Sequence, residues 1–212
     1  MAMMSRRTSF TLLGTLPLVG AASARGQDPV AAPTTAAREK IRARYFPNLN
    51  VVTHEGRKVR FYDDLIKGKI VTLNFMYADC EGICPGITAN LAKVQKALGD
   101  RIGRDIFMYS LTLKPEHDTP AVLKEYAEMH GVKPGWSFLT GAPADMELLR
   151  RKLGFVDPDP EVDKDKNEHI GNVRYGNEVL QLWASCPGLA SPQAIVASIG
   201  FVDWPKTKSS GD

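Results

Sequence analysis

Two cysteines, Cys80 and Cys84, have the clearest capacity for chemistry in this chain. They lie in the segment Cys80-Glu81-Gly82-Ile83-Cys84-Pro85, directly after the apolar run Ile70 to Tyr77. A strand that leads into a helix here places both sulfurs on one helical face, in the positive field of the helix N-terminus. Thiolates in that position suit disulfide chemistry or a soft metal ion such as Cu(I).

The elements around the pair can be predicted from the pattern of apolar residues. Ile70 to Tyr77 is nearly continuously apolar, as expected for a strand with both faces covered. Apolar residues then recur at helical spacing at Ile87, Leu91, Val94 and Leu98, which predicts a helix that ends at Gly99-Asp100.

The rest of the chain predicts an α/β fold. Further strands are expected at Val51–Thr53, Val59–Tyr62, Ile106–Leu113 and Trp136–Leu139, and further helices at Ala36–Tyr45, Pro120–Gly131, Pro143–Leu153 and Pro192–Ile199. Asp157 to Glu168 is polar and is expected to be an exposed loop. His169–Tyr175 and Glu178–Trp183 are expected to form a hairpin around a Gly176-Asn177 turn. This order predicts a sandwich on a mixed central sheet, with an N-terminal hairpin and a C-terminal hairpin plus helix.

The N-terminus has the layout of an export signal. Residues 1–24 contain Arg6-Arg7, an apolar stretch and an Ala22-Ser23-Ala24 cleavage pattern, and Ser5 to Phe10 is similar to a twin-arginine signal. We expect a linker and short helix at 25–47, a folded domain at 48–205 and a tail at 206–212. The apolar stretch is shorter than the roughly 20 residues that span a bilayer. A periplasmic protein is therefore predicted, with an uncleaved N-terminus that anchors it to the membrane as the alternative.

Composition and cysteine number narrow the function further. The chain has 212 residues, 43% of them hydrophobic and 24% charged, and a formal net charge of +3 that falls by two with the leader. This balance gives no reason to expect nucleic-acid binding. Three cysteines leave one unpaired, which argues against a disulfide framework. We therefore predict that the Cys80/Cys84 pair is functional and that Cys186 is a packing residue.

A third ligand would extend the pair to Cu(II), and histidine is the expected type. His54 is expected in a hairpin turn, His130 in the last turn of a helix and His117 in a loop before a helix, and these positions favour structural roles. His169 opens the predicted C-terminal hairpin, so it is tied to a strand and follows a long loop. The residues alone leave its role open.

The segment from Val51 to Met129 resembles the Sco/SenC copper proteins. The resemblance rests on Asn74-Phe75-Met76-Tyr77-Ala78-Asp79-Cys80, on Cys84-Pro85, on Leu91-Ala92, and on the stretch from Lys114-Pro115-Glu116-His117-Asp118 to Tyr126. It implies a thioredoxin-like three-layer fold with copper, as Cu(I) or Cu(II), bound by Cys80, Cys84 and His169. It places Asp118 beside the site or at a helix start. The chain departs from the family pattern at Glu81-Gly82, after His169, and from Asn177 to Pro205.

Two main functions follow, with a third as a non-redox alternative. The resemblance implies a metallochaperone that delivers copper to the binuclear copper site of cytochrome c oxidase, with the copper-site subunit or another copper protein as partner. The alternative is an exported thiol-disulfide reductase or thiol peroxidase that uses the same two cysteines. Oxidoreductases of this fold keep a proline before the strand that faces the cysteines, and none occurs between Pro160 and Pro187. The third candidate is a binding module that keeps only the fold.

Overall fold

A seven-stranded mixed sheet forms the centre of the protein, in a computed structural model that describes residues 34–165 and 171–203. The strand order is β2-β1-β5-β4-β3-β6-β7. The strands are β1 Asn50–Thr53, β2 Lys58–Arg60, β3 Ile70–Met76, β4 Ile106–Thr112, β5 Trp136–Thr140, β6 Asn172–Asn177 and β7 Leu182–Pro187. β3, β4 and β5 are parallel, while the hairpins β1–β2 and β6–β7 add antiparallel strands at the two edges.

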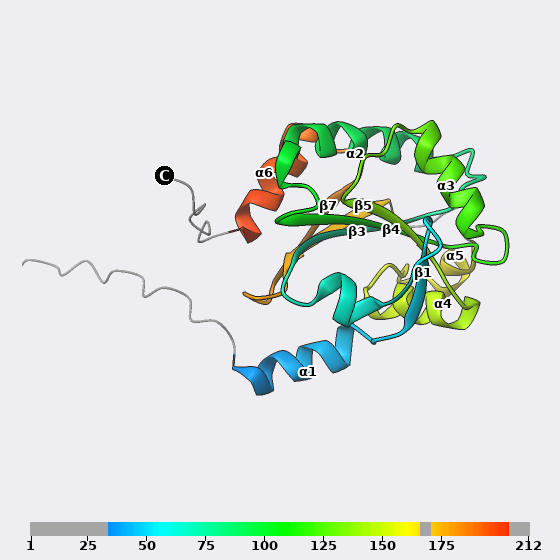
Figure 1. The fold of residues 1–212 in the computed structure, drawn as a ribbon. Coiled ribbons are helices and arrows are strands. Elements are labelled where there is room, and N and C mark those ends of the chain that lie inside the picture. The colour runs from blue at the N-terminus through cyan, green and yellow to red at the C-terminus, as the bar shows by residue number, and fades with distance from the viewer. Residues whose placement is uncertain (1–33, 166–170, 204–212) are drawn as a thin grey trace, which may run out of the picture. The chain divides into compact units, whose positions relative to one another are not determined.

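Helices cover both faces of the sheet, which gives the three layers expected for a thioredoxin-like fold (Figure 1). One face packs against α2 Cys84–Leu98, α3 Pro120–Met129 and α6 Pro192–Val202. The other face packs against α1 Thr35–Tyr45, the π-helical turn η1 Phe61–Ile66 and α4 Pro143–Lys152. The short helices η2 Gly99–Arg101 and α5 Pro160–Lys164 complete the elements of the described residues. The α/β class and the central mixed sheet are as predicted.

Local signals explain where several helices begin. The hydroxyl of Thr119 accepts a hydrogen bond from the Val122 N–H at 3.3 Å, and Pro120 follows at the first helical position. Ser191 caps α6 in the same way through Ala194, at 3.2 Å. These two starts were predicted correctly from the sequence. None of the helices in the described ranges is long and apolar enough to cross a membrane.

The predicted strand Val59–Tyr62 was wrong at its end. β2 ends at Arg60, and Phe61 and Tyr62 begin η1. The side chain of Asn48 accepts hydrogen bonds from the Tyr62 and Asp63 N–H groups at 3.1 and 3.2 Å, which supports a helical turn there. The buried rings of Phe61 and Tyr62 fill the core as part of that turn.

The turn of the C-terminal hairpin was placed wrongly. Gly176 and Asn177 lie inside β6, and the turn follows at residues 178–181. The ring of Trp183 covers Gly176 so closely that a Cβ at this glycine would lie 2.1 Å from the Trp183 Cε3 atom. Asn177 begins the turn because its side-chain oxygen accepts hydrogen bonds from the Val179 and Leu180 N–H groups, at 3.0 and 3.2 Å.

The polar stretch that we expected to be a loop contains a helix. Residues Pro160–Lys164 form α5, and the side chain of Asp159 accepts a hydrogen bond from the Glu161 N–H at its start. The prediction failed because Arg150 of α4 binds Asp163 of α5, a contact between segments that sequence spacing does not show.

Candidate metal centre

The two cysteines lie at the carboxyl end of the central strand β3. The chain leaves β3 after Met76, turns through residues 77–83, and enters α2 at Cys84. Both thiols are buried, with Cys80 6% and Cys84 1% exposed. No disulfide bond joins any of the three cysteines, all of which are described. The prediction of a strand-to-helix junction is confirmed.

The start of α2 has no capping side chain, and the Cys80 sulfur takes over part of that role. The N-cap residue is Ile83, whose side chain accepts no hydrogen bond. The Cys80 sulfur instead accepts hydrogen bonds from the backbone N–H groups of Cys84 and Gly82. Because the first N–H groups of a helix lack internal acceptors, a negative sulfur is stabilised there.

The two thiols differ in acidity. Burial raises the pKa of Cys80, but hydrogen bonds from the Cys84 thiol, the two backbone N–H groups and the Tyr77 hydroxyl outweigh it, so the pKa is lowered. Burial and the hydrogen bond to Cys80 raise the pKa of Cys84 to about 12. The first proton therefore leaves Cys80, and Cys84 holds the second.

Two residues that the sequence analysis did not single out support the pair. Tyr77 donates a hydrogen bond to the Cys80 sulfur, and its own pKa is raised by burial and by that contact. The Lys114 ammonium lies 3.8 Å from the centre of the Tyr77 ring and 3.3 Å from a carboxylate oxygen of Asp79. Tyr77 could have been noticed as the residue that ends the buried strand, three positions before Cys80, whereas nothing local indicates Lys114.

Asp118 holds the loop that carries Cys80. Its carboxylate is 1% exposed and accepts hydrogen bonds from the Ala78 N–H at 3.2 and 3.3 Å and from the Thr112 hydroxyl. Burial raises its pKa. Thr119 caps α3, so Asp118 joins the start of the cysteine loop to the end of β4.

His169, the predicted third ligand, lies outside the described residues, but the chain on either side of its segment is well placed. On the carboxyl side, Gly171 packs against the start of α2. A Cβ at Gly171 would lie 2.6 Å from the Ile83 Cδ1 atom and 3.1 Å from the Ile87 Cδ1 atom. The Gly171 carbonyl accepts a hydrogen bond from the Gly188 N–H at 2.8 Å.

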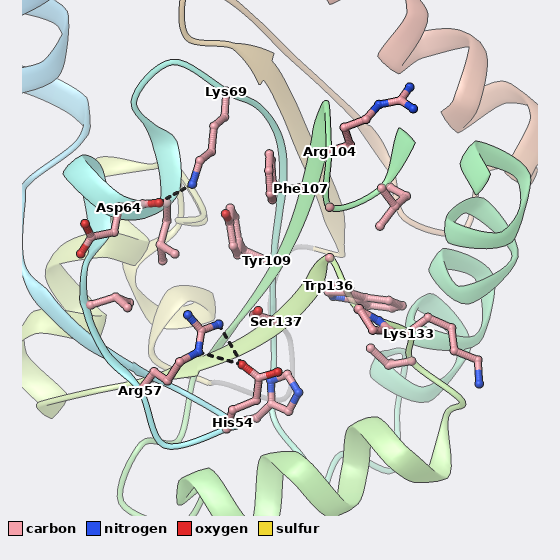
Figure 2. Close-up of a pocket in the computed structure, with 18 residues that line it drawn as sticks. His54, Arg57, Asp64, Lys69, Arg104, Phe107, Tyr109, Lys133, Trp136 and Ser137 are labelled. Atoms are coloured by element: carbon pink, nitrogen blue, oxygen red, sulfur yellow. Dashed lines mark hydrogen bonds and ion pairs between the residues drawn. The ribbon is translucent and has the colours of Figure 1, made fainter. Parts of the chain in front are cut away.

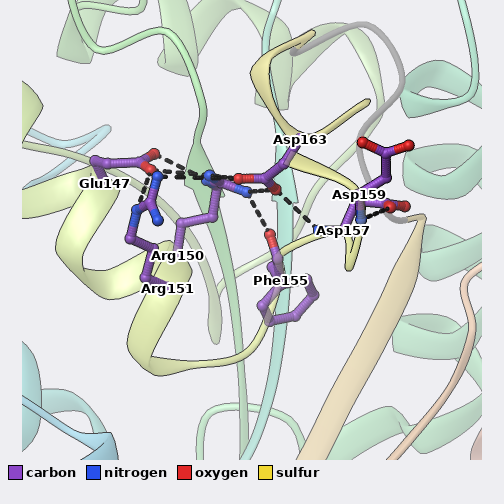
Figure 3. Close-up of polar contacts among 7 residues, drawn as sticks. All are labelled: Glu147, Arg150, Arg151, Phe155, Asp157, Asp159 and Asp163. Atoms are coloured by element: carbon purple, nitrogen blue, oxygen red, sulfur yellow. Dashed lines mark hydrogen bonds and ion pairs between the residues drawn. The ribbon is translucent and has the colours of Figure 1, made fainter. Parts of the chain in front are cut away.

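On the amino side, α5 is fastened to α4 by Arg150. Its guanidinium donates two hydrogen bonds to Asp163, at 2.6 and 2.7 Å, and two to Glu147, both at 2.8 Å (Figure 3). A fifth goes to the Phe155 carbonyl at 2.7 Å. The Arg150 side chain is 5% exposed. We call the bidentate contact between Arg150 and Asp163 the Arg150 clamp.

The other histidines have structural surroundings. His54 accepts a hydrogen bond from the Phe138 N–H at 3.1 Å, and the His130 ring lies 4.4 Å from the Tyr126 ring. Burial lowers the pKa of both. His117 lies in an exposed turn. Within the described ranges, no three His, Cys, Asp or Glu side chains meet in a way that would hold a metal ion.

Cys186 lies on β7 opposite Val173 of β6, partly buried against the core that includes Cys80 and Cys84. Burial raises its pKa. Its partly buried position agrees with the predicted packing role.

A cavity of about 760 Å³ lies at the other end of the sheet (Figure 2). Its walls include residues just before β3, β4 and β5, whereas the cysteines follow β3. Arg57 is paired with Glu55 at 2.8 Å, and Lys69 donates to the Asp64 carbonyl while its ammonium lies 4.7 Å from the centre of the Phe107 ring. These cations already have partners, and the cavity is remote from the thiols.

Comparison with known proteins agrees with this architecture. Residues 38–199 match the SCO1/SenC family. The chain belongs to the SCO1/SenC family. The SCO1 protein homolog of Bacillus subtilis (strain 168) is 36% identical over 78 residues, which cover 36% of this chain and 39% of that protein. The SCO2-like protein of Rickettsia felis is 33% identical over 66 residues, or 31% of this chain and 32% of that protein. These alignments thus span well under two thirds of both relatives.

Solved structures of the family share the fold. A SCO1/SenC family lipoprotein from Bacillus anthracis has a TM-score of 0.59 and 21% identity, with 73% of this chain and 92% of that chain covered. Copper-bound ScoI from Bradyrhizobium japonicum has a TM-score of 0.58 and 21% identity, with coverage of 72% and 96%. BsSco, described as a member of the Sco family of cytochrome c oxidase assembly proteins with a disulfide switch, has a TM-score of 0.60 and 23% identity, with coverage of 74% and 92%. These likenesses establish the fold.

Proposed function

We propose that this chain is an exported copper metallochaperone that carries its cargo on Cys80, Cys84 and His169. The observation that supports it most is the pair of buried, mutually hydrogen-bonded thiols at the uncapped start of α2. Soft thiolates prefer Cu(I), and an imidazole nitrogen suits Cu(II) as a further ligand. The donor set of the described residues therefore fits copper as a transported ion.

The position of Gly171 supports His169 as the third ligand. Two residues of chain span at most about 7 Å, and His169 is two residues before Gly171. Gly171 contacts Ile83, the residue directly before Cys84. The covalent tether alone thus keeps the Cα of His169 within reach of the thiols, since an imidazole side chain bridges several further ångströms.

The proposed partner is the copper-site subunit of cytochrome c oxidase or another copper protein. BsSco is described as belonging to a family of cytochrome c oxidase assembly proteins, and structures from Bradyrhizobium japonicum and yeast contain copper. Transfer would proceed by ligand exchange, in which thiolates of the acceptor replace Cys80 and then Cys84. The export signal predicted at residues 1–24 and the lipoprotein relative support a periplasmic location.

A thiol-disulfide reductase is the second candidate, and the geometry of the two thiols favours it specifically. The Cys80 thiolate would attack a substrate disulfide, form a mixed disulfide and release one substrate thiolate. Cys84, already hydrogen-bonded to Cys80, would then lose its proton and attack the Cys80 sulfur, which releases the second substrate thiol and leaves a Cys80–Cys84 disulfide. Two electrons pass to the substrate, and an external dithiol must return them.

Copper titrations of single-site variants test the first proposal. His169→Ala should keep Cu(I) binding, lose the visible absorption of bound Cu(II) and weaken Cu(II) binding, because only the imidazole is removed. The matched control is His117→Ala, which removes an exposed histidine and should behave as the parent. An unchanged Cu(II) spectrum in His169→Ala would show that the histidine is not a ligand.

A disulfide assay separates the two candidates. The metal-free protein is mixed with a model disulfide, and Cys80→Ser serves as the control. Rapid stoichiometric reduction by the parent together with weak copper binding would favour the reductase. Tight copper binding with slow reduction supports the metallochaperone.

A further inference from the structure

A second cavity, of about 310 Å³, lies on the sheet face that carries α1 and α4, which is opposite the face covered by α2. Its apolar walls include Ile41 and Phe46 from the N-terminal segment, Leu73 from β3 and Leu153 from the end of α4. The volume is within the range of small-molecule pockets, about 300 to 1,000 Å³, which are mostly apolar with a few convergent polar groups.

Arg174 is the main polar group of this cavity. It lies on β6 opposite Leu73, with its guanidinium 5.7 Å from the centre of the Phe155 ring. Its only hydrogen bond to the described residues is a long one, 3.4 Å to the Gly154 carbonyl. Among those residues no carboxylate is close enough to form an ion pair with it. A partly buried guanidinium without an anion is unusual, because its desolvation is normally offset by a paired acceptor.

Trp183 supplies a second free donor. Its ring packs on Gly176 and lies 4.5 Å from the Phe46 ring, in the wall of the same cavity. Its indole N–H is buried and has no hydrogen-bond partner within the described part of the chain. Lys152 adds a cation at the exposed end of α4. The polar groups of the walls are thus almost all donors, and no described lining residue is acidic.

We propose that this cavity binds an amphipathic monocarboxylate of the medium-chain fatty acid type. The carboxylate would accept hydrogen bonds from the Arg174 guanidinium and the Trp183 indole N–H, and the alkyl chain would lie against Ile41 and Leu153. A planar carboxylate matches the fork of a guanidinium, and the apolar walls match the chain. The cavity of Figure 2 is a poorer candidate because its cations Arg57 and Lys69 already have partners.

Titration calorimetry with decanoate below its micelle concentration tests the proposal on the metal-free full-length protein. We expect one decanoate per chain, no binding of acetate, and no comparable binding of decyltrimethylammonium, which has the same chain and the opposite charge. Arg174→Gln should weaken decanoate binding about tenfold or more, because a charged hydrogen bond is lost. Trp183→Phe keeps a ring over Gly176 and should weaken it about threefold.

The control variant is Arg104→Gln, which removes an exposed arginine near the other cavity and should leave decanoate affinity unchanged. Failure of decanoate to bind, or equal binding of decyltrimethylammonium, overturns the proposal. Binding of decyl sulfate without decanoate overturns the carboxylate class. Unchanged affinity in Arg174→Gln or, where that variant does not fold, in Trp183→Phe overturns the site.

Discussion

The Arg150 clamp should be essential for holding α5 in place, and replacing Asp163 by alanine tests this. Asp163→Ala removes a carboxylate that accepts two guanidinium hydrogen bonds, at 2.6 and 2.7 Å, and one from the Asp157 N–H at 2.9 Å. The side chains of Arg150 and Asp163 are 5% and 12% exposed, so solvent screens this pair poorly. Hydrogen bonds to Asp163 and then Glu147 raise the pKa of Arg150 above its usual value, so it stays charged in the variant.

The cost can be approximated from these contacts. Breaking a buried ion pair that leaves one charge alone costs about 3 to 5 kcal/mol. Arg150 keeps Glu147 and the Phe155 carbonyl, so we expect Asp163→Ala to lower the free energy of unfolding by about 2 to 3 kcal/mol. Arg151→Ala is the matched control, because this side chain is 62% exposed and its pairing with Glu147 is worth about 0.5 kcal/mol or less.

Urea unfolding of the metal-free protein at neutral pH, followed by circular dichroism, measures both variants. A loss below 1 kcal/mol in Asp163→Ala, or one no larger than in Arg151→Ala, would refute the structural argument. Cu(II) titration adds a functional readout, since α5 leads into the segment that carries His169. A destabilised variant with unchanged Cu(II) affinity would show that the clamp does not position that segment.

Two further predictions concern the cysteine loop and the Gly171 contact. Burial raises the pKa of Asp118, so its stabilising contribution is full below the ordinary carboxyl value of about 3.9 and is lost as pH rises through the folded value. Urea unfolding between pH 3 and 7 should show this fall in the parent, and Asp118→Asn should lack it; equal slopes would contradict the assignment. Gly171→Ala places a Cβ 2.6 Å from the Ile83 Cδ1 atom and should weaken Cu(II) binding, with Ile83→Val restoring it. No restoration in the double variant, measured by the same copper titration, would exclude this contact as the cause.

Much of the architecture could be predicted because it depends on local signals. Caps such as Thr119 and Ser191, and the apolar run of β3, determine helix starts and the buried strand within a few residues. The C-terminal hairpin shows where this fails. Gly176-Asn177 has the composition of a turn, but the Trp183 ring needs the space over Gly176, and the turn moves two residues along the chain.

The candidate site divides in the same way. Cys80 and Cys84 are neighbours in sequence, so their spacing and the strand-to-helix junction predict their placement. Their support is not local: Lys114 reaches Tyr77 from the far end of β4, and Asp118 reaches the Ala78 N–H across 40 positions. The role of His169 stays a prediction, supported by the contacts of Gly171.

The burial of both thiols has a consequence for the speed of exchange. A sulfur that is 1% or 6% exposed cannot be touched by a protein-sized acceptor until residues 77–83 move aside. That opening is a unimolecular event that precedes ligand exchange, and local openings of this kind occur on microsecond to second time scales. Under the proposed function, the transfer rate should therefore level off at high acceptor concentration, at a ceiling set by the hydrogen bonds of Asp118 and not by the encounter frequency.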